Sequence, residues 1–582
     1  MIARRRVPTV PAVPALMAST LAATLLVGTP AAQAAPAPPA GLPGTGELSA
    51  LARARPADLV EAERQFVERT PARYRDQEPA WAPCPADRVQ LPGSAAALEC
   101  ATVLVPRDWN DPQAGEPLSI AIARPVRDGE RPARSVITNP GGPGGAGLDL
   151  AASLSRQPAL AGTEVIGLDV RGTGASTPVL CDLPGAGTGT GPDVRDRSPE
   201  ALAANAAAMA ATARGCQSDP LSRFVNTEQT VADIDLVRDA LDRETIDWVG
   251  YSGGTWVGTQ YMTYFPARVG RFVLDSTVDV TAPFEQIFAG NQPAAFQRRF
   301  EVDFAAWAGE HHRLFHLGTD AAEVTGTYES LRAAYAARPL ELPALGITLD
   351  GTVIDLLITQ AMYSKTSFES LAWLMTGLRA VDAARTWAEP AVVDRMLAGL
   401  TGRIVDLLPA APVPSGDVPP HALTMAATFQ ATVCNDTAWT KDQAAFDAYA
   451  LRTGPRYPLL GWGTNRQPCA HWDRAPLTLP LPDGRDLPPV LLVQTERDAP
   501  TSVEGARRTH AALPTSRMVL VTDDGDHGVY AAAGNACVDA VVDAFLTTGV
   551  VPDDDVECAT TGIPAPGAFL LGNPDLREAV RG

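Results

Sequence analysis

The chain has 582 residues and a formal net charge of −20 at pH 7. Such an acidic chain repels the phosphate backbone, so nucleic acid is excluded as an expected partner. A chain of this length also exceeds a single hydrophobic core, and we expect a main domain with a large insertion or second lobe.

Residues 1–34 have the order of a secretory signal peptide. Three arginines at 4–6 are followed by an apolar stretch at 15–28 and by the small-residue site Ala32-Gln33-Ala34. The apolar stretch is shorter than the roughly 20 residues that a transmembrane helix needs, although an uncleaved anchor is the alternative. We therefore expect a secreted, extracellular protein with no membrane span.

The eight cysteines form no Cys-x-x-Cys pair, which argues against a zinc or thioredoxin-like site. An even count in an exported protein indicates disulfides, with buried free thiols as the alternative. Eight cysteines allow about 105 connectivities, and we expect sequence neighbours to pair, because each such pair closes a short or medium loop. The expected disulfides are Cys84–Cys100, Cys181–Cys216, Cys434–Cys469 and Cys537–Cys558.

The N-terminal half predicts strands that alternate with helices. Residues 35–47 are rich in Ala and Pro and predict a linker or pro-segment, and 48–73 have apolar residues at helical spacing. Strands are expected at 101–106, 118–124, 135–138, 164–170, 246–249 and 269–274, and helices at 230–241 and 255–265. This alternation predicts a mostly parallel sheet with helices on both faces.

The alternation stops at about residue 282 and resumes at about 486. Helical segments are expected at 296–315, 321–337 and 367–384, followed by a Pro-rich linker at 408–420 and by strands at 490–495 and 517–521. The simplest explanation is an α/β core in two parts, residues 48–281 and 486–582, with a mostly helical cap inserted at 282–485.

The segment Gly250-Tyr251-Ser252-Gly253-Gly254 fits the G-x-S-x-G pattern. An apolar strand precedes it and a helix follows, which is the context of a nucleophile elbow, a tight turn whose crowded neighbours must be glycine. A Gly-rich turn with an inert serine is the alternative. We expect Ser252 to be the catalytic nucleophile of an α/β-hydrolase fold.

A serine hydroxyl needs a base, and in this fold the order along the chain is Ser, acid, His. His527 follows the strand at 517–521 and lies on the loop at its carboxyl end, whereas His471 and His510 lack this context. Asp498 follows the strand at 490–495, where a carboxylate orients the imidazole. Glu496 is its close rival, and Asp526 is better explained as a loop-forming residue.

The tetrahedral intermediate needs backbone N–H donors, and the Gly-rich stretch 139–147 follows an early strand where this fold supplies one of them. We expect Gly142 and Gly253 to form the oxyanion hole. A phosphate-binding loop is disfavoured because no Gly-Lys-Ser/Thr follows and Pro143 removes a donor. The dinucleotide spacing G-x-G-x-x-G is also absent.

These motifs resemble those of the proline iminopeptidase-related hydrolases, and within them most closely those of the secreted tripeptidyl aminopeptidases of filamentous actinobacteria. The resemblance rests on 141–144, 169–176, 250–255 and 525–528 and spans residues 80–565. It implies release of tripeptides from free N-termini of peptides and proteins through an acyl-enzyme. The chain departs from the family pattern on both sides of Asp498, where it has Thr495-Glu496-Arg497 and Ala499-Pro500-Thr501.

An exopeptidase must also bind the protonated amine of its substrate, which calls for a carboxylate in a partly closed pocket. Asp436 and Glu285 are the candidates, and an ordinary solvated acid is the alternative for each.

Two other functions use the same fold: a carboxylesterase or lipase with the same triad, and a binding protein that keeps an inactive hydrolase fold. No cofactor is expected. No metal is expected either, because the histidines at 311, 312 and 316 lack the H-E-x-x-H pattern. We expect a monomer.

Overall fold

The computed structural model describes Leu48 and residues 59–89, 97–127, 129–181, 191–343, 345–407, 420–482 and 487–567. The expected signal peptide at 1–34 and linker at 35–47 lie outside these residues, as do residues 408–419 of the expected Pro-rich linker. In these ranges no helix combines the length and apolar character needed to span a membrane.

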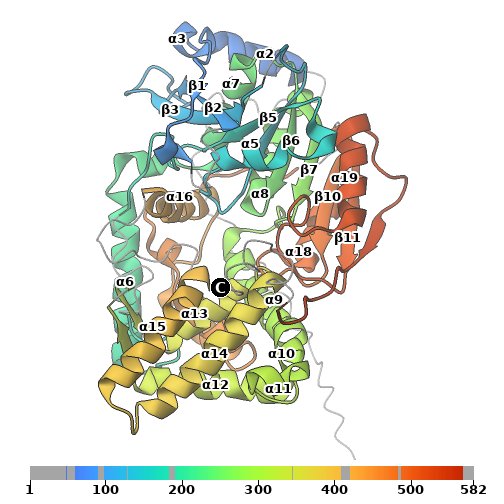
Figure 1. Cartoon of the computed structure of the whole chain (residues 1–582). Coiled ribbons are helices and arrows are strands. Elements are labelled where there is room, and N and C mark those ends of the chain that lie inside the picture. Colours follow the sequence, from blue (N-terminus) through green and yellow to red (C-terminus); the bar gives the residue numbers. More distant parts are fainter. Residues whose placement is uncertain are drawn as a thin grey trace, which may run out of the picture. The chain divides into compact units, whose positions relative to one another are not determined.

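The core of the protein is a ten-stranded sheet with the order β1-β2-β3-β5-β4-β6-β7-β10-β11-β12 (Figure 1). Strands β1 to β3 pair antiparallel with their neighbours, and the strands from β5 to β12 in this order run parallel. The strands are β1 (Ala82–Pro83), β2 (Leu98–Val105), β3 (Leu118–Pro125), β4 (Ser135–Asn139), β5 (Glu164–Leu168), β6 (Ile246–Tyr251), β7 (Val269–Asp275), β10 (Val490–Thr495), β11 (Ser516–Thr522) and β12 (Val556–Ala559). This is the mostly parallel α/β-hydrolase sheet expected from the sequence.

Both faces of the sheet are buried because successive side chains of each strand point to opposite sides. Trp248 and Leu492 belong to one hydrophobic cluster, whereas their neighbours Val249 and Leu491 belong to another. Helices α7, α8 and α18 supply residues to the first cluster, and α5 and α19 to the second. The helices around the sheet are α2 (Leu59–Arg69), α3 (Ala72–Arg75), α5 (Leu148–Leu154), α7 (Thr227–Ala240), α8 (Gly253–Tyr264), α18 (Val503–Ala512) and α19 (Ala536–Thr548).

Between β7 and β10 the chain is mainly helical and supplies most of a further hydrophobic cluster, which Ala499, after β10, also joins. Figure 1 shows α12 to α15 side by side in this part of the chain. Its elements are α9 (Gln292–Arg299), α10 (Ala306–Glu310), α11 (His312–Phe315), α12 (Ala321–Ala337), β8 (Leu340–Leu342), β9 (Ile347–Leu349), α13 (Gly351–Ala361), α14 (Phe368–Ala384), α15 (Pro390–Leu407), α16 (Pro420–Asp436) and α17 (Gln443–Thr453). The helix expected at 296–315 is interrupted by a π-helical stretch, Phe300–Ala305.

Helix α6 (Pro199–Gln217) was not expected from the sequence. Its alanine-rich composition gives it little amphipathic contrast, so the periodicity that marks other helices is weak. It packs against the inserted helix α16 through Ala213 and Cys216, which share a cluster with Ala427 and Ala431. The segment after β5 therefore joins the same layer as the insertion.

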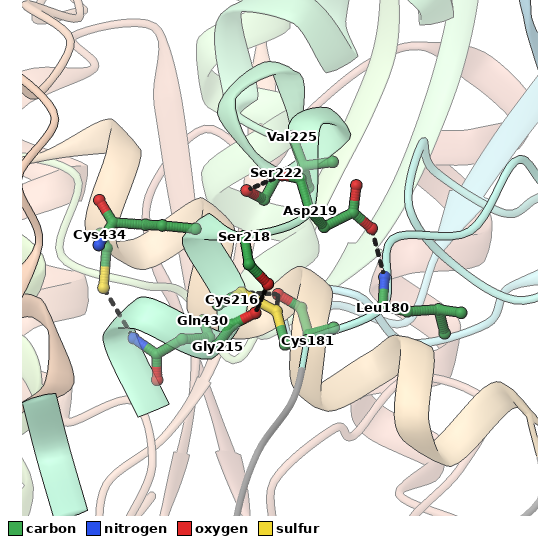
Figure 2. The surroundings of a disulfide bond; sticks show 12 residues. Leu180, Cys181, Gly215, Cys216, Ser218, Asp219, Ser222, Val225, Gln430 and Cys434 are labelled. Carbon is green, nitrogen blue, oxygen red and sulfur yellow. Dashed lines mark hydrogen bonds between the residues drawn. A yellow bond between two sulfur atoms is a disulfide. The ribbon is translucent and has the colours of Figure 1, made fainter. Parts of the chain in front are cut away.

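The four disulfides join the sequence neighbours: Cys84–Cys100, Cys181–Cys216, Cys434–Cys469 and Cys537–Cys558. Figure 2 shows how the second of these ties the loop after β5 to the end of α6. Beside it, the Leu180 N–H donates to Asp219 at 2.9 Å, and the Gln430 amide donates to Cys434 Sγ at 2.7 Å. Two disulfides therefore lie close to the contact between α6 and α16.

A buried ion pair joins the loop after β5 to α7. Arg171 and Asp233 are almost fully buried and form a two-point contact, and Arg171 also donates to the carbonyls of Pro106 and Phe224. Removing one partner of a buried pair leaves the other charge without compensation.

We expect Arg171→Met to lower the free energy of unfolding by about 3–5 kcal/mol, measured by urea denaturation. The control is Arg338→Met, which breaks a half-exposed pair with Asp382 and is expected to cost less than about 1 kcal/mol. Equal losses in the two variants would contradict a structural role for the Arg171 pair.

Candidate active site

Ser252 lies in the turn between β6 and α8 with φ 53° and ψ −124°. A serine with positive φ is strained and persists only where its surroundings hold it. Here the Ser252 N–H donates to the Asp275 carbonyl at 2.9 Å, and the Thr255 N–H and hydroxyl donate to the Ser252 carbonyl at 2.8 and 2.6 Å. The turn thus holds the serine at the carboxyl end of the sheet.

Glycines around Ser252 are required by space. A Cβ on Gly250 would lie 2.2 Å from Trp248 Nε1, and a Cβ on Gly254 would lie 2.6 Å from the Asn139 carbonyl oxygen. Both distances are well inside van der Waals contact, so an alanine at either position would push the elbow apart.

The expected oxyanion loop lies directly against the elbow. A Cβ on Gly141 would meet the Tyr251 carbonyl oxygen at 2.3 Å, and one on Gly253 would meet the Gly142 backbone at 3.1 Å. The Gly253 N–H is the first of α8 and, as at any helix N-terminus, has no intrahelical partner. The backbones of Gly142 and Gly253 are therefore neighbours beside Ser252, which is the arrangement expected of an oxyanion hole.

Asp169 holds the far end of the oxyanion loop. Its two oxygens accept hydrogen bonds from the N–H groups of Gly147, at 2.7 Å, and Ala175, at 2.8 Å. The side chain is fully buried, and burial raises its pKa to about 6 although these hydrogen bonds oppose the shift. This explains the role of the Asp in the 169–176 motif, which the sequence marked without assigning a contact.

His527 and Asp498 form a direct pair. His527 Nδ1 lies 2.9 and 3.1 Å from the two oxygens of Asp498, which is fully buried and also accepts the Thr501 N–H at 2.8 Å. Because the carboxylate accepts from Nδ1–H, Nε2 is left unprotonated in the neutral ring. The Thr501 hydroxyl lies 3.4 Å from the same Nδ1.

The other candidates for acid and base lie elsewhere. Glu496 is 43% exposed and accepts the Asp523 N–H. Asp526 pairs with Arg299. His510 contacts Ser516 and Asp555, and His471 contacts Gln443.

Asp275 is a buried carboxylate that the sequence reasoning did not assign to the site. It ends β7, and its side chain accepts the N–H groups of Val529 and Tyr530, two and three residues after His527, at 2.9 and 2.7 Å. Its neighbour Ser276 accepts the Gly528 N–H at 2.8 Å. Burial raises the pKa of Asp275 to about 6, against the effect of these hydrogen bonds. The carboxyl end of a parallel strand next to the elbow was the available signal.

Ser252 and His527 line the same cavity, which has a volume of about 530 Å³. Its walls come from the first turn after β4, from α5 and from the loop that follows His527. The lining residues are Pro140, Leu150, Ser153, Leu154, Arg156, Gln157, Tyr251, Ser252, His527, Gly528, Tyr530, Ala531 and Ala532.

Asp436, expected to bind a substrate amine, has a different role in the structure. It is buried and accepts from the Thr227 N–H at 2.9 Å, from the Thr227 hydroxyl at 2.5 Å and from Trp256 Nε1 at 3.2 Å. Burial raises its pKa to about 7. The expectation is corrected because these protein donors occupy the carboxylate, which joins the end of α16 to the start of α7.

Glu285, the other candidate, is half-buried just before the π-helical stretch Gln286–Asn291. Its oxygens accept the Thr440 N–H at 2.5 Å and the Thr440 hydroxyl at 2.9 Å. Unlike Asp436, it retains access to solvent.

Comparison with known proteins places this site in a family. The chain is 32% identical over 508 residues to the tripeptidyl aminopeptidase of Streptomyces lividans, covering 84% of this chain and 87% of the relative. The chain belongs to the tripeptidyl aminopeptidase family. The family model described as TAP-like protein matches residues 458–558, which include Asp498 and His527.

The chain also has more distant relatives, among them two proteins of Mycobacterium tuberculosis H37Rv. Serine protease Hip1 is 27% identical over 506 residues, covering 82% of this chain and 90% of the relative. Carboxylesterase B is 27% identical over 489 residues, covering 79% and 86%. Family membership and the α/β-hydrolase fold identify the chain as a serine hydrolase of the peptidase type.

The environment of His527 in this peptidase favours the protonated ring. Burial by itself lowers the pKa of His527, but the charge of Asp498, its hydrogen bond and the charge of Asp275 outweigh burial, so the pKa is raised above the ordinary 6.5. A histidine acts as a general base only when it is neutral. The raised pKa of His527 therefore shifts the appearance of activity to higher pH.

We expect kcat/KM of the peptidase to rise with pH through a midpoint above 6.5. Asp275→Asn should move this midpoint to lower pH, because the variant lacks a negative charge that favours the imidazolium form. The measurement is a pH–rate profile with a chromogenic substrate.

The control for this profile is Glu496→Gln, which removes a solvent-exposed carboxylate at the end of β10 and should leave the midpoint in place. A midpoint that stays unchanged in Asp275→Asn would show that Asp275 has no electrostatic influence on the base.

Proposed function

We propose that the chain is an exported serine exopeptidase that releases tripeptides from free N-termini of peptides and proteins through an acyl-enzyme. The observation that carries the proposal is the pairing of His527 with buried Asp498 at the cavity that Ser252 also lines. The number of residues released follows the name of the Streptomyces relative.

In the acylation step, His527 Nε2 takes the proton of Ser252 Oγ as the oxygen attacks the scissile carbonyl. The N–H groups of Gly142 and Gly253 stabilise the oxyanion, and Asp498 stabilises the imidazolium that has formed. His527 then donates its proton to the leaving amine, which departs and leaves the acyl-enzyme on Ser252.

In the deacylation step, His527 takes a proton from water, which attacks the ester carbonyl of the acyl-enzyme. The same two N–H groups hold the second oxyanion. Its collapse releases the acyl product as a carboxylic acid and returns the proton from His527 to Ser252.

We propose Glu285 as the group that binds the substrate amine. Phe288 packs on Phe429 with ring centroids 5.4 Å apart, and Phe429 follows Thr428, which contacts Gly144 of the oxyanion loop. Glu285 therefore lies a few side chains beyond the oxyanion loop, and an extended tripeptide spans about 10 Å. Thr440 orients the carboxylate without burying it.

The domain assignment belongs to the same proposal. Residues 48–281 and 486–582 form the catalytic core, and the helical insertion at 282–485 closes the substrate site as a cap. Export through the signal peptide at 1–34 is supported by the four disulfides, which persist in oxidising compartments.

The alternative function is that of a carboxylesterase, and the similarity to carboxylesterase B keeps it in consideration. The same triad hydrolyses esters and amides, so the triad itself does not separate the two classes. A requirement for a free N-terminal amine on the substrate does separate the peptidase from the esterase.

The proposal is tested with one defined peptide whose N-terminus is either free or acetylated, with mass spectrometry of the products. We expect a tripeptide from the free form alone and no product from Ser252→Ala. Hydrolysis of p-nitrophenyl esters without peptide cleavage would refute the peptidase and favour the esterase.

We expect Glu285→Gln to lower kcat/KM for peptides with a free N-terminus by about 10- to 100-fold, mainly through KM, because a charge-assisted hydrogen bond is worth about 1.5–3 kcal/mol. Steady-state kinetics on tripeptide amides measures this change.

The matched control for Glu285→Gln is Glu341→Gln, since Glu341 is also a carboxylate that accepts a threonine hydroxyl, that of Thr348 on the β8–β9 hairpin. It should keep the wild-type KM. An unchanged KM in Glu285→Gln would rule out its contact with the amine.

A further inference from the structure

The loop that carries His527 is in direct contact with the inserted helices. The His527 N–H donates to the Tyr363 carbonyl at 2.9 Å, and the Tyr363 ring meets the His527 ring edge-on at 5.3 Å between centroids. Two residues later, the Lys365 N–H donates to Asp526 at 2.7 Å. Residues 363–365, between α13 and α14, therefore lie along the residues that set the position of the imidazole.

Lys365 also reaches this loop with its side chain. Its ammonium group donates to Asp524 Oδ2 and lies 3.5 Å from Asp526 Oδ2. The side chains of Lys365 and Asp524 are 5% and 4% exposed, so solvent contributes little to either charge. Lys365 thus bridges two carboxylates that lie one and three residues before His527.

Further charges complete this contact. Arg299, at the end of α9, donates to Asp526 at 2.7 Å and also to Asp303, which accepts from Arg497 at 2.9 Å. Arg497 directly precedes Asp498, and its N–H donates to the Asp524 carbonyl at 2.8 Å. We call this group the buried charge cluster. Its members are Arg299, Asp303, Lys365, Arg497, Asp524 and Asp526.

The cluster balances three positive charges against three negative charges in a region of low dielectric. Burial raises the pKa of Asp524, but the hydrogen bond from Lys365 and others outweigh burial, and the net pKa lies below the ordinary value. Lys365 is the cation that pairs with Asp524 in the described part of the chain, so its removal leaves this buried carboxylate without a charged partner there, which is costly. The π-helical stretch Phe300–Ala305 follows Arg299 and contains Asp303, and such stretches are frequent at functional sites.

The use of lysine at this position is unusual for the chain. Of the 47 lysine and arginine residues, only Lys365 and Lys441 are lysines. A lysine ammonium is a compact point charge, whereas arginine presents a planar fork. The small head group lies between the carboxylates of Asp524 and Asp526, and Arg299 donates to the other oxygen of Asp526, Oδ1.

We propose that Lys365 is a positioning residue for the reaction: through Asp524 and Asp526 it fixes the loop that carries His527, and so couples the helical insertion to the catalytic base. The inference rests on the proposed role of His527. A structural ion pair alone would stabilise the fold without setting the reactivity of Ser252.

The test measures the rate at which a fluorophosphonate labels Ser252, a reaction that needs the base but no peptide. We expect folded Lys365→Met to label about 100-fold more slowly than wild type, since small displacements of a catalytic group have effects of this size. In peptide hydrolysis kcat should fall while KM changes little, and Lys365→Arg should recover part of the rate.

Two further variants separate positioning from stability. The double variant Lys365→Met/Asp524→Asn removes both charges together and leaves no unpaired aspartate at position 524. It replaces the single variant if Lys365→Met fails to fold. The double variant should also be labelled slowly. Arg332→Met breaks a comparably buried contact with Asp355 inside the insertion, and also a contact with the less buried Asp193 of the segment before α6. It should lower the melting temperature yet label at the wild-type rate.

A readout of geometry makes the outcome independent of the proposed activity. The proton of His527 Nδ1 shared with Asp498 should give a far-downfield NMR resonance. We expect this resonance to shift or broaden in Lys365→Met and in the double variant, and to persist in Arg332→Met. Wild-type labelling and an unchanged resonance in folded Lys365→Met or in the double variant would overturn the proposal. If the wild-type protein is labelled normally but releases no tripeptides, the proposed function is wrong, whereas the inference about Lys365 is unaffected.

Discussion

The site depends on the contact between two backbones at the carboxyl end of the sheet. The loop after β4 and the turn after β6 approach so closely that a side-chain carbon on Gly141 would lie 2.3 Å from the Tyr251 carbonyl oxygen. The strained turn of Ser252 lies at this contact, where the backbones of Gly142 and Gly253 are also neighbours. The contact is possible only because β4 and β6 are neighbours in a parallel sheet, so that both loops leave the same edge.

Buried carboxylates hold the other loops around this contact. Asp169 accepts N–H groups at the end of the oxyanion loop, Asp275 accepts them after His527, and Asp498 accepts the Thr501 N–H while it orients the imidazole. In each case the cost of burying a charge is offset by backbone donors or by a cation, which makes the arrangement rigid. The active site is therefore fixed by electrostatics as much as by packing.

Much of the site was predictable from the sequence because its signals are local. Glycine spacing around Ser252 follows from sterics within a few residues, and the strands before Asp498 and His527 are apolar runs that end in polar loops. Helix α6 was missed because an alanine-rich helix lacks an apolar stripe. Asp436 was misassigned because an acid beside a cysteine gives no local sign of whether it faces solvent or the interior.

The sequence by itself determined the alternation of strands and helices in the core, the candidate nucleophile elbow, and the residue types available for a triad. Only the tertiary structure decided which buried charges meet. Asp275 lies more than 250 residues from the Tyr530 N–H that it binds, and Arg299 and Lys365 contact Asp526 from separate parts of the insertion. Such contacts depend on how the insertion packs against the sheet, and long-range packing is a property of the whole chain that no short segment encodes.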